Sequence, residues 1–232
     1  MSEPALRLSG VRKQYHGLRP LRVQSLTVGA GERVALSGFD AGAAEVLVNL
    51  VTGASVPDEG TVEVCGRATH AIADGDEWLT WLDRFGIVSP RAVLLDAATL
   101  GQNLAMPLTL QIEPVPPEIQ TQVEALADLV GLDRGLLGRP VAGLDPPVLA
   151  RAHLARAIAL GPSLLIMEHP TIAFTSGQAK PFGETVARVS AARQLATLAI
   201  SEDTDFSSAV SDRRLALNPA TGELKPQRRW FW

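Results

Sequence analysis

A glycine-containing loop between an apolar strand and a helix carries the clearest chemical pattern in the sequence. Loops of the pattern G-x-x-x-x-G-K-[ST] bind phosphate through backbone N–H groups, a lysine and a hydroxyl that holds magnesium. Aligned on Gly38, this chain has Ala43 for the second glycine, Ala44 for the lysine and Glu45 for the hydroxyl. The sequence therefore predicts the shape of a phosphate loop without its cationic chemistry. The candidate loop comprises Gly38, Phe39, Asp40, Ala41, Gly42, Ala43, Ala44, Glu45 and Val46.

The two substitutions at the end of this loop replace attraction for a polyphosphate by repulsion. Unlike charges ~4–5 Å apart attract by roughly 3–4 kcal/mol at an effective dielectric constant near 20. Losing Lys at Ala44 and adding a carboxylate at Glu45 changes affinity by several decades on this scale. We expect ATP and Mg²⁺ to bind at most weakly, and no other metal. A carboxylate, either Asp40 or Glu45 in the first helical turn, is a second possible occupant of the anion cradle.

Short strands alternate with amphipathic helices along the chain, which predicts an α/β fold with a mostly parallel sheet. The N-terminal strands predict an antiparallel sheet, and the proline-punctuated stretch after Arg91 predicts an inserted helical lobe. Predicted strands are 5–8, 21–28, 33–36, 61–64, 86–88, 163–167, 196–200 and 214–217, the last as an edge strand. Predicted helices follow Gly42 and cover 77–85, 119–130, 148–160 and 182–193.

Composition excludes several classes of protein. The chain has 232 residues, 46% of them hydrophobic, which is enough for one large domain with a sizeable core. A net charge of −4 and the absence of basic runs argue against nucleic-acid binding. The single cysteine, Cys65, excludes an internal disulfide framework and fits a reducing compartment. No uninterrupted stretch of 18 apolar residues occurs, so we expect any membrane role to come through a partner.

Several landmarks in a fixed order resemble the ATPase subunit of ABC transporters over essentially the whole chain. Tyr15 stands where that family stacks an aromatic ring on adenine, and Gly38 begins the phosphate loop. Further similar segments are 57–60 after that loop, 94–108 nearest to members serving lipid or lipoprotein traffic, 151–158, and the strand and its exit at 164–171. The resemblance implies a P-loop NTPase-like (RecA-like) fold in one ABC ATPase-like domain. It divides into residues 1–90, a helical lobe at 91–145 and a return to the core at 146–232.

The family's functional positions are substituted almost throughout. Pro90 stands at the Q-loop glutamine. Glu168 and His169 stand at the Walker B aspartate and the catalytic glutamate, and Glu202 at the switch histidine. The signature loop aligns with Leu144, Asp145, Pro146, Pro147 and Val148. Since proline has no N–H group, this loop cannot clamp a nucleotide as two glycines would.

The resemblance implies a membrane permease as partner, an intact ATPase subunit as a possible second one, and a homo- or heterodimer. It places the chain in the cytoplasm, peripherally on the inner face of the membrane. The leading hypothesis is a non-hydrolytic structural or regulatory subunit that docks through residues 93–108. Two alternatives stay open: a divergent active ATPase using Glu168 and His169, and a soluble scaffold or sensor. The tail Arg228–Trp232 predicts a protein or membrane-interface contact, or packing against the chain's own core.

Overall fold

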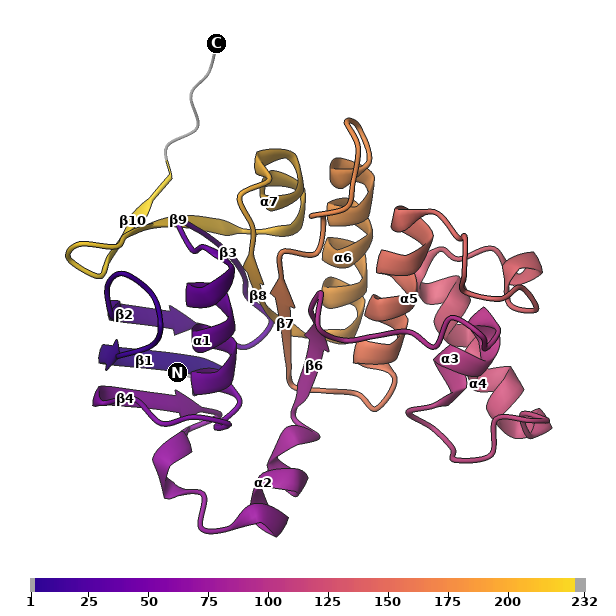
Figure 1. Ribbon diagram of the computed structural model, residues 1–232, viewed down its shortest axis with the longest axis horizontal. Coiled ribbons are helices and arrows are strands. Elements are labelled where there is room, and N and C mark those ends of the chain that lie inside the picture. The colour runs from indigo at the N-terminus through magenta and orange to yellow at the C-terminus, as the bar shows by residue number, and fades with distance from the viewer. Residues whose placement is uncertain (1–2, 228–232) are drawn as a thin grey trace.

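The computed structural model describes residues 3–227 and shows two sheets with helices between and around them (Figure 1). A four-stranded antiparallel sheet has the order β2-β1-β4-β5, and a six-stranded sheet has the order β10-β9-β3-β8-β7-β6. Five neighbouring strands of the larger sheet are parallel, and only β10 runs antiparallel to its neighbour. The predicted mostly parallel α/β core with an N-terminal antiparallel sheet is therefore confirmed.

The strands are β1 Leu6–Lys13, β2 Leu21–Val28, β3 Arg33–Ser37, β4 Glu59–Val64, β5 Arg67–Ala68, β6 Phe85–Val88, β7 Leu164–Glu168, β8 Ala196–Ile200, β9 Arg213–Asn218 and β10 Glu223–Pro226. The helices are α1 Ala41–Val51, α2 Gly75–Leu82, α3 Leu100–Ala105, α4 Pro117–Val130, α5 Pro146–Ile158, α6 Ala179–Arg193 and α7 Thr204–Val210. Two 3₁₀ turns, Thr69–Ala71 and Arg134–Leu136, complete the set for the described residues.

The central strands are buried on both faces, which explains their continuous apolar runs. In β7, Leu164 and Ile166 pack towards α1 and the antiparallel sheet, whereas Leu165 and Met167 pack towards α5 and α6. Alternate side chains of one strand thus join two different core clusters. Helices α3 and α4 lie at the end of the molecule away from the antiparallel sheet (Figure 1).

Two element predictions need correction. The strand at 214–217 is not an edge strand, because β10 pairs outside it through a hairpin at Asn218–Gly222. The helix predicted over 77–85 begins at Gly75, where Asp74 caps it, and ends at Leu82, because Phe85 already belongs to β6. Helix α7 was not predicted. The tail Arg228–Trp232 lies outside the described residues.

Candidate functional site

The predicted phosphate loop lies between β3 and α1. Gly38 has φ +82°, and a Cβ atom there would lie 2.8 Å from the Leu217 carbonyl oxygen, so the turn requires glycine. Asp40 caps α1, and its Oδ1 accepts a hydrogen bond from the Ala43 N–H at 2.7 Å. Because the helix begins at Ala41, Glu45 does not lie in its first turn, which corrects the expectation for that residue.

A carboxylate of the chain itself occupies the entrance of the loop. The Gly38 N–H donates to Glu202 Oε1 at 2.7 Å, and the Phe39 N–H donates to the same oxygen at 3.2 Å. Glu202 belongs to the connection between β8 and α7. Three N–H groups of the loop are therefore paired with carboxylates, those of Gly38 and Phe39 with Glu202 and that of Ala43 with Asp40.

The sequence predicted Asp40 or Glu45 as the carboxylate that occupies the anion cradle. In the structure, Glu202 accepts two of the loop N–H groups and Asp40 accepts one. Asp40 does accept one N–H, but Glu45 points to an arginine instead of the loop. Sequence reasoning placed Glu202 at the switch position but did not predict its contact, because 163 residues separate it from Phe39. Parallel strands bring the two together, since β3 and β8 are direct neighbours.

Arg91 joins Glu45 and Glu168, the two carboxylates that the sequence comparison predicts at the family's metal-binding positions. Its Nη1 lies 2.7 Å from Glu45 Oε1, and its Nη2 lies 2.7 Å from Glu168 Oε2. Ser89 donates its hydroxyl to Glu168 Oε2 at 2.8 Å, so that oxygen receives two hydrogen bonds. The Glu168 side chain is only 6% exposed, whereas Arg91 and Glu45 are about half exposed at 42% and 49%. Sequence reasoning missed Arg91, for which the residue types alone gave no signal.

His169 follows Glu168 in a left-handed conformation with φ +42°. Its N–H donates to the Ile200 carbonyl at 2.8 Å, and its ring lines an apolar cavity of about 260 Å³ with Pro146, Ile172 and Phe174. The surroundings of the ring are therefore mostly apolar.

Tyr15 lies against the loop. A Cβ atom on Gly42 would be 3.2 Å from Tyr15 Cε2, so the ring covers the first turn of α1. Burial, together with the negative charge of Asp40, raises the pKa of the Tyr15 hydroxyl. One side of the Tyr15 ring is therefore in contact with α1 of the same chain.

The signature-like residues form the start of α5. Pro146 and Pro147 are its first two residues, with Asp145 as the N-cap and Leu144 before it. The Val148 N–H, the next donor, is bonded to the Asp145 carbonyl at 2.9 Å. The first turn therefore presents no N–H group from its first two residues to an anion.

The residues of this site do not fit a magnesium triphosphate. Magnesium in P-loop enzymes is held by the loop hydroxyl and a Walker B carboxylate, with a lysine on the phosphates. Here Ala44 is fully buried, Glu202 engages the loop amides, and the Arg91 guanidinium lies between Glu45 and Glu168. Within residues 3–227, no group of three His, Cys, Asp or Glu side chains is arranged to hold a metal ion.

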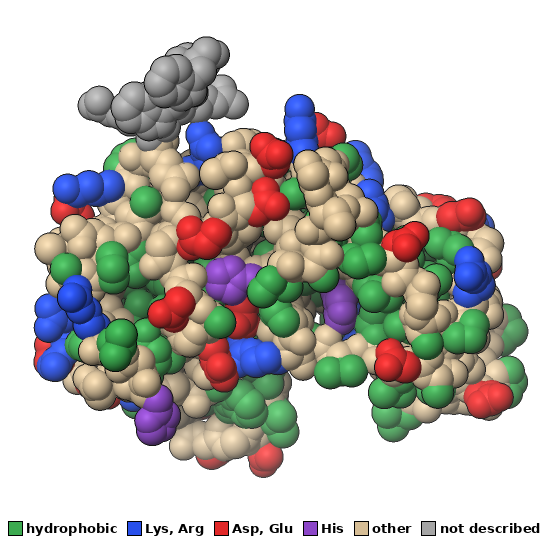
Figure 2. Space-filling view, turned by 45° about the horizontal axis from the view of Figure 1, so that its top comes forward, with side chains coloured by type: hydrophobic (Ala, Val, Ile, Leu, Met, Phe, Trp, Pro, Cys, Tyr) green, Lys and Arg blue, Asp and Glu red, His purple; other side chains and the backbone are tan. Residues whose placement is uncertain are grey.

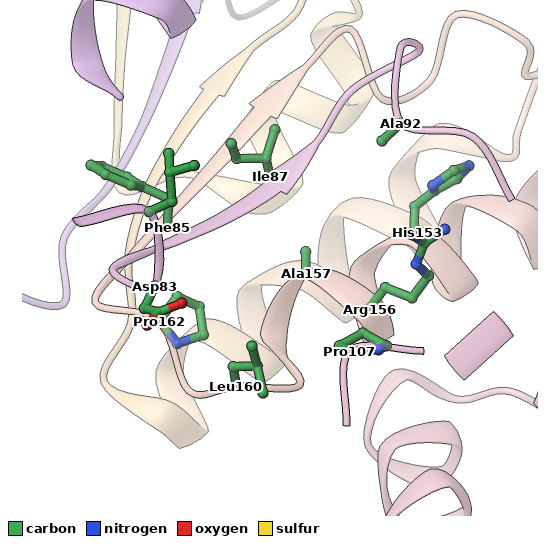
Figure 3. A pocket seen from close by; sticks show the side chains of 11 residues that line it. Asp83, Phe85, Ile87, Ala92, Pro107, His153, Arg156, Ala157, Leu160 and Pro162 are labelled. Atoms are coloured by element: carbon green, nitrogen blue, oxygen red, sulfur yellow. The ribbon is translucent and has the colours of Figure 1, made fainter. Parts of the chain in front are cut away.

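A second feature is a groove of about 260 Å³ beside α5 (Figure 3). His153, Arg156 and Ala157 of α5 form one wall, Phe85 and Ile87 of β6 another, and Ala92 and Pro107 border it from the segment between β6 and α4. Burial, followed by the nearby Arg156 charge, lowers the pKa of His153. Leu160, which lines the groove, is 60% exposed, and Val93 and Leu95, which follow Ala92 along the chain, are 71% and 52% exposed.

Acidic and basic side chains are interspersed over the face shown in Figure 2, without a continuous patch of one sign. In the described part of the chain, no helix is both long enough and apolar enough to cross a bilayer.

The chain is similar to curated ATP-binding proteins of transporters along most of its length. It is 28% identical over 217 residues to the methionine import ATP-binding protein MetN of Brucella abortus, covering 94% of this chain and 58% of that protein. It is 28% identical over 192 residues to the lipoprotein-releasing system ATP-binding protein LolD of Psychrobacter arcticus, covering 83% and 84%. The chain thus spans less than two thirds of the length of MetN. No protein-family model matches it.

Solved structures show the same fold. The dimeric ABC transporter cassette MJ0796 superposes with a TM-score of 0.78 at 19% identity, covering 98% of this chain and all of that one. The cassette cbiO1 of Clostridium perfringens, part of the cbiONQ transporter complex, gives a TM-score of 0.81 at 17% identity, covering 97% and 88%. By sequence this chain is similar to ATP-binding proteins of import and lipoprotein-releasing systems, and by structure it has the fold of ABC transporter cassettes.

Proposed function

We propose that this chain is a cassette subunit that docks on a membrane permease and does not hydrolyse ATP at its own site. The observation that carries the proposal is the Glu202 carboxylate on the Gly38 and Phe39 amides, next to a buried Ala44 where the phosphate-binding lysine would stand. A triphosphate entering the loop would have to displace a carboxylate and would meet no lysine. We therefore propose a structural or regulatory role for this subunit.

Titration of the purified chain with fluorescent ATP, with and without Mg²⁺, tests this proposal. We expect no saturable binding below about 1 mM, since each lost decade of affinity corresponds to about 1.4 kcal/mol and several decades are lost. Competition by unlabelled ATP distinguishes binding in the site from adhesion of the dye. Saturable, magnesium-dependent binding in the micromolar range would contradict the proposal, as would ATP hydrolysis that His169→Ala abolishes.

A divergent ATPase built on Glu168 and His169 finds little support in the site. Glu168 already receives hydrogen bonds from Ser89 and Arg91, and His169 lines an apolar cavity. A general base must reach the proton it removes, and the imidazole of His169 faces the mostly apolar lining of its cavity.

The groove beside α5 is the proposed docking site for the permease. It lies between Ala92 and Pro107, which bracket most of the segment at 93–108 predicted to dock. Exposed Leu160 lines it, and exposed Val93 and Leu95 follow Ala92 along the chain. An amphipathic segment of a membrane protein laid into such a groove would cover these side chains. Docking there would hold the chain on the inner face of the membrane, and the dimeric state of MJ0796 supports a homo- or heterodimer.

Filling the groove should remove docking while leaving the fold intact. Ala157 lines the groove and is partly exposed, so Ala157→Trp places a large ring where the partner segment would lie. We expect at least a tenfold loss of the full-length chain recovered with its permease from detergent-solubilised membranes. Changes at the centre of an interface typically have effects of this size on binding.

Leu79→Trp is the matched control, because Leu79 is 59% exposed on α2 and does not line the groove. Equal recovery of both variants would show that the permease binds elsewhere. Recovery of the chain with soluble proteins only would favour the scaffold or sensor hypothesis instead.

A further inference from the structure

Arg91 stands where the family's fold would place a divalent cation. Its guanidinium contacts Glu45 on α1 and Glu168 at the end of β7, both at 2.7 Å. These two positions align with the loop hydroxyl and the Walker B carboxylate that hold magnesium in P-loop enzymes. A cation would need to displace an arginine that already satisfies a nearly buried carboxylate, which is costly. One positive charge between these two carboxylates is thus supplied by the chain.

Arg91, Ser89 and Glu168 are all hydrogen-bonded to one another. Its backbone N–H donates to Ser89 Oγ at 3.1 Å and its Nε to the same oxygen at 3.3 Å. Ser89 in turn donates to Glu168, so the backbone at residue 91 and the carboxylate of β7 are linked through one hydroxyl as well as directly. Arg91 therefore fixes main chain and side chain together.

The same residue begins the segment that borders the docking groove. Ala92 lines the groove (Figure 3), and its N–H donates to the Ser89 carbonyl at 3.0 Å. The Val93 carbonyl accepts from Arg156 of α5 at 2.8 Å. The Leu95 N–H donates to Oδ1 of the fully buried Asn103 at 2.8 Å, and Asn103 Nδ2 returns a bond to the Leu95 carbonyl. Residues 89–95 are thus hydrogen-bonded to β7 at their N-terminal end and to α5 and α3 at their C-terminal end.

We propose that Arg91 replaces bound metal and nucleotide as the link between the loop site and the docking segment, so that the groove keeps one arrangement without ATP. This inference rests on the proposed function, since it concerns the same site and the same groove. It names Arg91 as the linking residue, and it predicts that the permease docks whether or not a ligand is bound to the loop.

Hydrogen exchange of residues 89–95 in the full-length chain tests the inference. The Arg91, Ala92 and Leu95 amides are all hydrogen-bonded and report directly on the segment. We expect Arg91→Gln to accelerate exchange of this segment by about tenfold or more, since a local opening then breaks fewer contacts. Arg91→Lys should be intermediate, because one ammonium cannot pair with both carboxylates in the fork geometry of arginine. Millimolar Mg-ATP should leave the wild-type exchange unchanged.

Arg188→Gln is the control, an exposed arginine on α6 that should leave the segment unchanged. If Arg91→Gln does not fold because Glu168 is left unpaired, the double variant Arg91→Gln with Glu168→Gln removes both charges and should still show the fast exchange. Unchanged exchange in the variant that folds would overturn the inference, and so would Mg-ATP slowing exchange of the wild-type segment. Micromolar ATP binding that leaves this segment unaffected would contradict only the proposed function.

Discussion

Replacing Ala44 by Lys, Glu45 by Ser and Glu202 by Gln in one chain should raise the affinity for Mg-ATP by at least about 100-fold. The triple variant restores the cation, provides a metal-binding hydroxyl and removes the negative charge from the Gly38 and Phe39 amides. Each unit change of charge at ~4–5 Å corresponds to roughly 3–4 kcal/mol at an effective dielectric constant of 20, so a gain of only two decades allows for incomplete fit. Isothermal titration calorimetry with Mg-ATP measures it.

The matched control replaces Ala44 by Met in place of Lys and keeps the other two changes. Methionine has nearly the length of lysine without its charge, which separates the electrostatic effect from the volume added at a fully buried position. If the lysine and methionine variants bind ATP equally weakly, the missing charge is not what keeps nucleotide out. The loop shape would then be at fault.

Truncating Phe206 to alanine should lower the free energy of unfolding by about 3–5 kcal/mol, the range for removing a fully buried aromatic ring. Phe206 of α7 is fully buried and stacks on Phe182 of α6 with ring centroids 5.8 Å apart. Its N–H also donates to the Asp203 cap, next to Glu202. Denaturant unfolding measures the loss, with the slope of the transition checked for two-state behaviour.

Phe174→Ala is the comparison, since Phe174 is only partly buried and meets Phe182 edge-on at 5.6 Å. We expect a clearly smaller loss for it, because less surface leaves water on folding and the remaining cavity is open. Equal losses in the two variants would mean that the Phe182–Phe206 stack does not hold α7 on the sheet.

Much of the fold was predictable because its signals are local. Apolar runs of about five residues marked the buried strands, and β7 and β8 lie where those runs predicted them. The short helices were harder. Thr99 and Gln102 form a capping box before α3, a pattern visible in the sequence, yet α3 has only six residues. The outer strand β10 has exposed and half-buried residues without strong alternation, so only its pairing with β9 reveals it.

The amino-acid sequence by itself determined that residues 38–46 contain no lysine and that residues 146 and 147 have no N–H group to donate, because no conformation can restore either. Only the tertiary structure decided what replaces that chemistry. Glu202 reaches Gly38 because β8 lies beside β3, and Arg91 reaches both Glu45 and Glu168 because β6 lies beside β7, with α1 packed against it. Electrostatic pairing depends on distance in space, and distance along the chain does not give it.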